Sequence, residues 1–145
     1  MFRIRVERLI RKDIDSVFDV LSDHGNYRRF PGIERSVLLE AGKPEENGEG
    51  ALRCLGSGPV EFYERITRYE RPTRFDYLIE RSKPLPFKHE KGTLVFAPEG
   101  GSTRVVWTSE GHIDVPLLGK LVLDRLVERR GTLLFGRLLE YVDGG

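Results

Sequence analysis

The feature that most constrains the fold is a series of β-strand patterns between residues 33 and 114, with no helical pattern between them. Apolar and polar side chains alternate within these segments, and short runs rich in glycine, proline and polar residues separate them. Strands are predicted at Ile33–Glu40, Ala51–Gly56, Val60–Glu70, Phe75–Arg81, Phe87–Ala97 and Thr103–Asp114. Consecutive strands joined by short turns pair antiparallel, so this region is predicted to form an antiparallel meander.

Two elements precede the meander. Residues 2–10 alternate between apolar and charged side chains, which predicts a first strand with one solvent-exposed face. A helix follows, because Ile14, Val17, Phe18 and Leu21 fall at helical spacing and Asp13 suits its N-cap. Gly25 is expected to end this helix, and a second short helix before Pro31-Gly32 would turn Tyr27 and Phe30 inward.

The last element is a long, strongly apolar helix predicted at Val115–Val142. In its first half Leu118, Val122 and Leu126 share one face, with Leu121 beside them. After Gly131 the apolar positions are Leu134, Leu138 and Tyr141. This drift predicts a bend or a change of packing partner near Gly131.

Composition excludes several classes of protein. A chain of 145 residues is the size of one domain, predicted at residues 1–145. With 24 basic and 23 acidic residues the chain has no global field to attract nucleic acid. One cysteine and three histidines predict no disulfide, no metal site and no cofactor. Charged residues near the N-terminus, and the absence of about 18 consecutive apolar residues, predict a cytoplasmic protein without stable membrane insertion.

The element order predicts an α+β fold in which about seven strands form one antiparallel sheet. One face of this sheet must be covered, and the C-terminal helix is the only element large enough to cover it. When a twisted sheet curves around a helix, its inner face does not contact the helix along the whole length of the helix. We therefore expect an elongated cavity between the sheet and the helix.

Several short motifs, in their order along the chain, resemble the START-like (SRPBCC) superfamily and its bacterial polyketide cyclase/dehydrase and lipid-transport branch. They are Val17-Phe18, Leu21-Ser-Asp23, Tyr27, Phe30-Pro-Gly32, Glu64-Arg-Ile66, Tyr77, Leu85-Pro86, Gly92-Thr-Leu and Gly101-Ser-Thr-Arg-Val-Val-Trp107. The resemblance implies a helix-grip fold, a curved seven-stranded sheet wrapped around a long C-terminal helix with one or two short helices after the first strand. The chain departs from the family at Lys12-Asp13, where an Ala-Pro pair is common, but Asp13 can cap the helix instead.

Strand alternation predicts which side chains face the cavity. Together with loop and helix positions, it gives a set of candidate ligand-binding residues: Tyr27, Phe30, Phe62, Glu64, Phe75, Tyr77, Ile79, Phe87, Glu90, Leu94, Trp107, Ser109, Leu118, Leu121, Val122 and Arg125. The same parity places His89 and His112 on the outer face, and His24 is expected to be a charged imidazole at a helix end. One bulge would move a whole strand to the other face.

Glu64 is the most informative of these residues. A carboxylate between apolar neighbours on a buried face must be paired or protonated. One interpretation is a structural ion pair with Arg125 or Arg129 of the long helix. The other is a polar anchor for a ligand hydroxyl or carbonyl group in an apolar cavity. In plant hormone receptors of the same superfamily, the glutamate of a similar Glu-Arg-aliphatic motif lines the pocket.

Three function classes follow. The favoured one is a module that binds or carries an apolar small molecule, such as a lipid, quinone, polyketide or isoprenoid. The second is an aromatase/cyclase-type enzyme using Glu64 and Tyr77, although no nucleophile motif assigns a catalytic residue. The third is a protein-interaction module with a filled cavity, in which the C-terminal helix could also form a homodimer surface.

Overall fold

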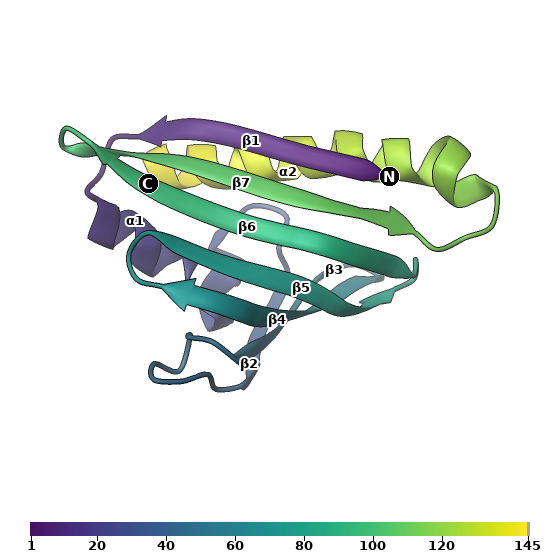
Figure 1. Cartoon of the computed structure of the whole chain (residues 1–145), viewed down its shortest axis with the longest axis horizontal. Helices are drawn as coiled ribbons and strands as arrows, with labels where there is room; N and C mark the ends of the chain where they lie inside the picture. Colours follow the sequence, from purple (N-terminus) through teal and green to yellow (C-terminus); the bar gives the residue numbers. More distant parts are fainter. Residues whose placement is uncertain (145) are drawn as a thin grey trace.

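A computed structural model describes residues 1–144 of the chain (Figure 1). Its strands are β1 (Phe2–Ile10), β2 (Arg35–Glu40), β3 (Leu52–Ser57), β4 (Val60–Glu70), β5 (Arg74–Lys83), β6 (Phe87–Glu99) and β7 (Ser102–Ile113). Its helices are α1 (Ile14–Leu21), the 3₁₀ helix η1 (His24–Arg29), the π-helical turn η2 (Gly119–Leu123) and α2 (Asp124–Gly144). The predicted α+β order is confirmed, and strand ends differ from the predicted ones by at most two residues.

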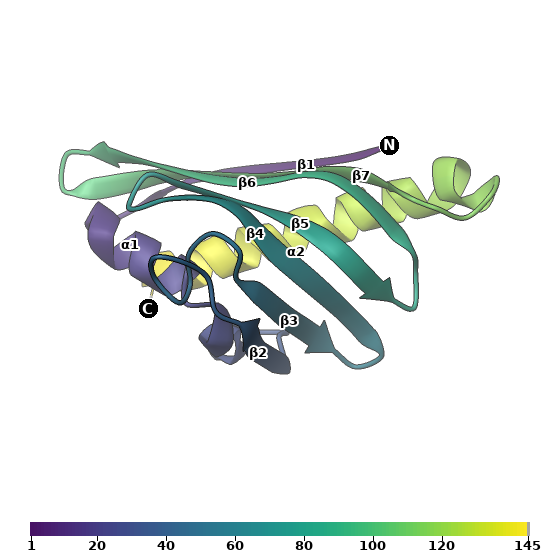
Figure 2. The same cartoon turned by 60° about the horizontal axis from the view of Figure 1, so that its bottom comes forward.

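The seven strands form one sheet in the order β1-β7-β6-β5-β4-β3-β2, and every neighbouring pair is antiparallel. The predicted meander therefore runs from β2 to β7, and β1 returns to pair with β7 from Phe2 opposite Gly111 to Ile10 opposite Thr103. Figure 2 shows the sheet curving over α2, which runs along its inner face. This arrangement is the helix-grip fold that the sequence motifs imply.

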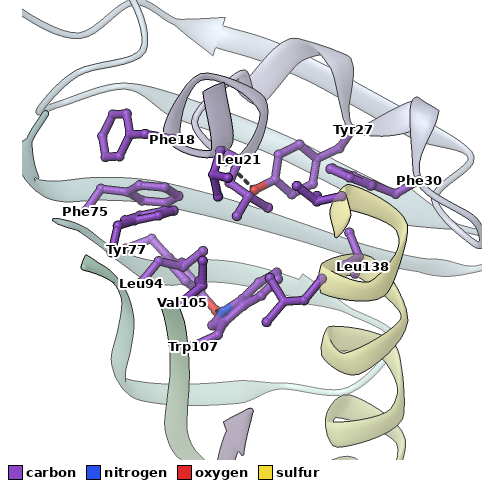
Figure 3. Packing of buried hydrophobic residues seen from close by; sticks show 14 of the residues in the cluster. Phe18, Leu21, Tyr27, Phe30, Phe75, Tyr77, Leu94, Val105, Trp107 and Leu138 are labelled. Carbon is purple, nitrogen blue, oxygen red and sulfur yellow. Dashed lines mark hydrogen bonds between the residues drawn. The ribbon is translucent and has the colours of Figure 1, made fainter. Parts of the chain in front are cut away.

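The two short helices close one end of the sheet. Asp13 caps α1 as predicted, accepting a hydrogen bond from the Ser16 backbone N–H at 3.1 Å. Gly25 does not end α1, because the helix already ends at Leu21 and Gly25 lies inside η1. Tyr27 and Phe30 turn inward as predicted, and the Tyr27 hydroxyl donates to the Leu21 carbonyl (Figure 3).

The long helix changes its packing partners along its length, as predicted. Near the start of α2, Leu123 and Val127 pack against Phe2 and Ile4 at one end of the sheet. Beyond Gly131, the buried residues Leu138, Leu139 and Val142 join the main core. The helix itself runs without interruption through Gly131, and the irregular hydrogen bonding lies earlier, in η2. No helix within residues 1–144 is both long enough and apolar enough to span a bilayer.

Gly131 allows α2 to approach β1 closely, because a Cβ atom at this position would overlap the end of the Ile4 side chain. We expect Gly131→Val to lower the free energy of unfolding by about 1–3 kcal/mol through overpacking. Gly136 lies on the same helix, and a Cβ atom there would have no neighbour within 4 Å. Gly136→Val is therefore the matched control and should change stability by less than about 0.5 kcal/mol. Urea denaturation of both variants tests the contrast, and equal losses would contradict close packing at Gly131.

Candidate functional site

A cavity of about 440 Å³ lies between the inner face of the sheet and α2. Its wall is mostly apolar and is built from several strands, the segment after η1, the loop before β6 and the middle of α2. The wall residues that are exposed to solvent mark its opening. They include Gly32, Val60, Lys83, Pro84 and Leu126. The opening therefore lies between the β3–β4 turn, the β5–β6 loop and the first half of α2.

Half of the sixteen candidate residues line this cavity. They are Tyr27, Phe62, Glu64, Tyr77, Ile79, Phe87, Trp107 and Ser109. All except Tyr27 come from the strands β4 to β7, and simple alternation predicts the inward position of all of these except Phe87. Figure 3 shows Tyr77 and Trp107 extending from the sheet toward the turn of α2 that carries Leu138, which also lines the cavity.

Three other candidates face inward but lie in the solid core rather than on the cavity wall. Phe30, Phe75 and Leu94 are each at most 2% exposed. Phe75 packs edge-to-face against Phe18 of α1, with 5.9 Å between the ring centroids. The cavity stops at this end of the sheet because α1 fills the space above it (Figure 3).

The predictions for Glu90 and His89 are wrong, and a β-bulge is the reason. The register of β6 against β7 shifts between His89 and Lys91. The extra residue reverses the alternation, so Glu90 is exposed and His89 turns inward toward Ser109. His112 stays on the outer side as predicted, with its Nε2 atom 3.7 Å from a Glu90 carboxylate oxygen.

The candidates on the long helix also lie elsewhere. Leu118, Leu121, Val122 and Arg125 are exposed and do not line the cavity. They lie on the side of this segment that faces solvent, whereas Gly119 and Asp124 on the other side are buried. Leu126 and Val127, farther along α2, are the first helix residues on the cavity wall.

Glu64 is paired, but neither expected arginine is its partner. Arg53 of β3 donates a hydrogen bond from Nε to Glu64 Oε1 at 2.9 Å, and its Nη2 atom lies 2.7 Å from the same oxygen in a salt bridge. The guanidinium lies between the rings of Tyr27 and Tyr77, 4.8 and 5.3 Å from their centroids. Arg53 and Glu64 are 1% and 7% exposed, and both line the cavity. The cavity thus has a buried ion pair in one wall.

Arg53 is a buried polar residue of the cavity wall that was not predicted from the sequence. The predicted strand Ala51–Gly56 has the pattern that places it, because Ala51, Arg53 and Leu55 alternate with outward residues and are all buried. An arginine at the inward position of a short strand, opposite Glu64 in the neighbouring strand, was the available signal.

His24 supports this ion pair and is not a charged helix-end residue as expected. It is fully buried, its Nδ1 atom lies 3.1 Å from Arg53 Nη1, and its Nε2 atom lies 2.9 Å from the Asn47 carbonyl oxygen. Since the guanidinium can only donate, Nδ1 must accept and Nε2 must carry the proton. Burial and the Arg53 charge lower the pKa of His24 to about 3. The imidazole is therefore neutral and acts as an acceptor for Arg53.

A second polar group surrounds Tyr77, next to Arg53 in the cavity wall. The Trp107 indole N–H donates to the Tyr77 hydroxyl at 2.9 Å, and burial raises the pKa of Tyr77. The Ile79 backbone N–H donates to His89 Nδ1, so His89 Nε2 carries the proton and donates to Ser109 Oγ at 2.8 Å. Burial lowers the pKa of His89 to about 4. Tyr77 is thus held as a neutral phenol with its hydroxyl at the cavity.

The comparisons with known proteins agree with this architecture. Residues 1–142 match the model of a family described as polyketide cyclase / dehydrase and lipid transport. The chain belongs to this family. A search of the curated proteins finds no match.

This chain shares its fold with several solved structures at low sequence identity. A protein from Thermus thermophilus is 22% identical with a TM-score of 0.79, covering 98% of this chain and 94% of its own. The Zhui aromatase/cyclase from Streptomyces is 18% identical with a TM-score of 0.73, covering 97% and 92%. A START superfamily protein from Mycobacterium smegmatis is 14% identical with a TM-score of 0.70, covering 97% and 99%. These likenesses establish the fold.

Proposed function

We propose that the chain binds or carries an apolar small molecule of the lipid, quinone, polyketide or isoprenoid type. The observation that carries the proposal is the cavity of about 440 Å³, whose wall is apolar except for a few buried polar side chains. Small-molecule sites are typically about 300–1,000 Å³ and combine apolar walls with a few fixed polar groups. A cavity of this size favours ligand binding over an interaction module with a filled interior.

The polar wall groups would orient the ligand. Arg53 donates hydrogen bonds to Glu64 from Nε and to His24 from Nη1, which leaves further N–H donors for a ligand oxygen atom. The hydrogen bond and the salt-bridge contact from Arg53 both reach the same Glu64 oxygen, Oε1, so Oε2 is left to accept from a ligand hydroxyl. A ligand with an apolar body and one carbonyl or hydroxyl group fits this arrangement.

Filling the cavity should abolish binding. Ile79 lines the cavity from β5, and we expect Ile79→Trp to weaken binding of the apolar dye 1-anilinonaphthalene-8-sulfonate by about tenfold or more, because the indole occupies ligand space. Val95→Trp is the matched control, since Val95 is 39% exposed and outside the cavity wall. Dye fluorescence titration measures both, and unchanged binding by a folded Ile79→Trp variant would contradict the proposal.

A cyclase-type enzyme is the second candidate, and one observation favours it. Catalysis of this kind needs several polar or titratable groups that converge on the substrate, and Arg53, Glu64 and Tyr77 all line the same cavity. A cationic donor and a phenol beside a substrate carbonyl could polarise it for ring closure. The likeness to the Zhui aromatase/cyclase is in keeping with this candidate.

A further inference from the structure

The segment that leads into α2 exposes an unusual group of apolar side chains. Leu117 is 80% exposed and Leu121 is 70% exposed, and Leu118, Val122 and Leu126 beside them are 56%, 53% and 39% exposed. We call these five residues the leucine ridge. Figures 1 and 2 show that this part of the chain extends past the ends of the strands, away from the core. A contiguous exposed apolar surface of this kind marks an interaction site.

The exposed charged residues on the helix segment that carries the leucine ridge are all basic. Lys120, Arg125, Arg129 and Arg130 are exposed, and none of them pairs with a carboxylate within residues 1–144. The acidic residues of the same stretch do not offset them at the surface. Asp124 is buried against the Met1 amino group and the Ile113 N–H, and Glu128 is half-buried and accepts from the Arg3 N–H at 2.8 Å. Asp114, just before the ridge, lies 3.7 Å from Lys88.

We propose that the leucine ridge docks onto the surface of an anionic lipid bilayer. Exposed leucines flanked by lysine and arginine are the composition with which interfacial helices insert into the headgroup region of anionic membranes. The positive charge also selects this occupant over a second copy of the chain, because two such surfaces facing each other would repel. Docking is peripheral, in keeping with the absence of a spanning helix within residues 1–144.

The ridge connects directly to the cavity. Val122, Leu126, Arg130 and Leu134 follow one another at intervals of four residues, which places them on the same side of the helix. Leu126, Arg130 and Leu134 also line the cavity. A bilayer seated on the ridge would therefore lie at the cavity opening, and an apolar ligand could pass between cavity and membrane without crossing water. This exchange role rests on the proposed function, whereas docking itself does not.

Co-flotation with lipid vesicles tests the docking. We expect the wild-type chain to bind vesicles containing phosphatidylglycerol more tightly than pure phosphatidylcholine vesicles. The double variant Leu117→Ser/Leu121→Ser should lose about tenfold or more of this binding. Leu39→Ser/Leu133→Ser is the matched control, because those leucines are 49% and 58% exposed outside the ridge, and it should bind like wild type. Lys120→Gln/Arg125→Gln should weaken binding to the anionic vesicles alone by about tenfold.

Three results would overturn the docking proposal. They are no binding of the wild-type chain to anionic vesicles, equal losses in the ridge and control variants, or a concentration-dependent dimer in sedimentation that the ridge variant abolishes. The cavity-filled Ile79→Trp variant separates the two proposals. If it loses dye binding but keeps vesicle binding, both proposals stand. If neither the wild-type chain nor any variant binds the dye, but the wild-type chain still binds vesicles, only the ligand proposal fails.

Discussion

Replacing Arg53 with methionine should lower the free energy of unfolding by about 3–5 kcal/mol, because it leaves the buried Glu64 carboxylate without its partner. Arg53 is 1% exposed, holds Glu64 through one hydrogen bond and a salt-bridge contact to the same oxygen, and also donates to His24. Urea denaturation followed by circular dichroism measures the loss. The variant would also remove the guanidinium hydrogen-bond donors from the cavity wall, since Arg53 lines it.

A surface arginine gives the matched control. Arg104 pairs with Glu7 and Glu99 but is 37% exposed, so Arg104→Met should cost no more than about 1 kcal/mol. The double variant Arg53→Met/Glu64→Leu should recover much of the loss, because it removes both buried charges together. An Arg53→Met variant as stable as Arg104→Met would show that the Arg53–Glu64 pair is not the buried contact described above.

The second large effect is a loss of stability in acid. The pKa of His24 is lowered to about 3 and that of His89 to about 4, against an ordinary value near 6.5, mainly by burial. The unfolded chain therefore binds more protons than the folded chain between those values. Stability is full above pH 6.5 and falls as pH drops toward 4, with a slope approaching about 1.4 kcal/mol per pH unit for each histidine.

Urea denaturation between about pH 7 and pH 5 measures this slope, a range in which ordinary aspartate and glutamate side chains stay ionised. His24→Gln/His89→Gln should flatten the pH dependence, since glutamine can still accept from Arg53 and Ile79 but takes up no proton. His112→Gln is the control, because His112 lies on the outer side of the sheet, and it should keep the wild-type slope. A double variant as acid-sensitive as wild type would contradict the buried, neutral state of the two imidazoles.

Much of the fold could be predicted because hydrophobic periodicity depends on local sequence. The strand Val60–Glu70 has the predicted bounds, and its alternation correctly turns Glu64 and Ile66 inward. Asp13 caps α1 because an aspartate before an amphipathic run satisfies free backbone N–H groups. The short turns between strands left the antiparallel meander as the simplest topology.

The site was harder to predict because its details depend on contacts between distant residues. The bulge at His89 depends on how β6 pairs with β7, and no local sequence pattern in β6 predicts it. The partner of Glu64 lies one strand away rather than on the helix, which depends on the register of β3 against β4. The start of the long helix looked like core from its leucines, yet Leu118 and Leu121 lie on its solvent-exposed side.

The central claim is that the cavity holds an apolar small molecule, and native mass spectrometry of gently purified protein tests it most directly. Solvent extraction of the same sample identifies what is released. We expect one apolar molecule with a carbonyl or hydroxyl group per chain in the wild-type protein and in Val95→Trp, and none in Ile79→Trp. A wild-type chain that is empty when purified, and that also fails to bind the naphthalene dye, would contradict the claim.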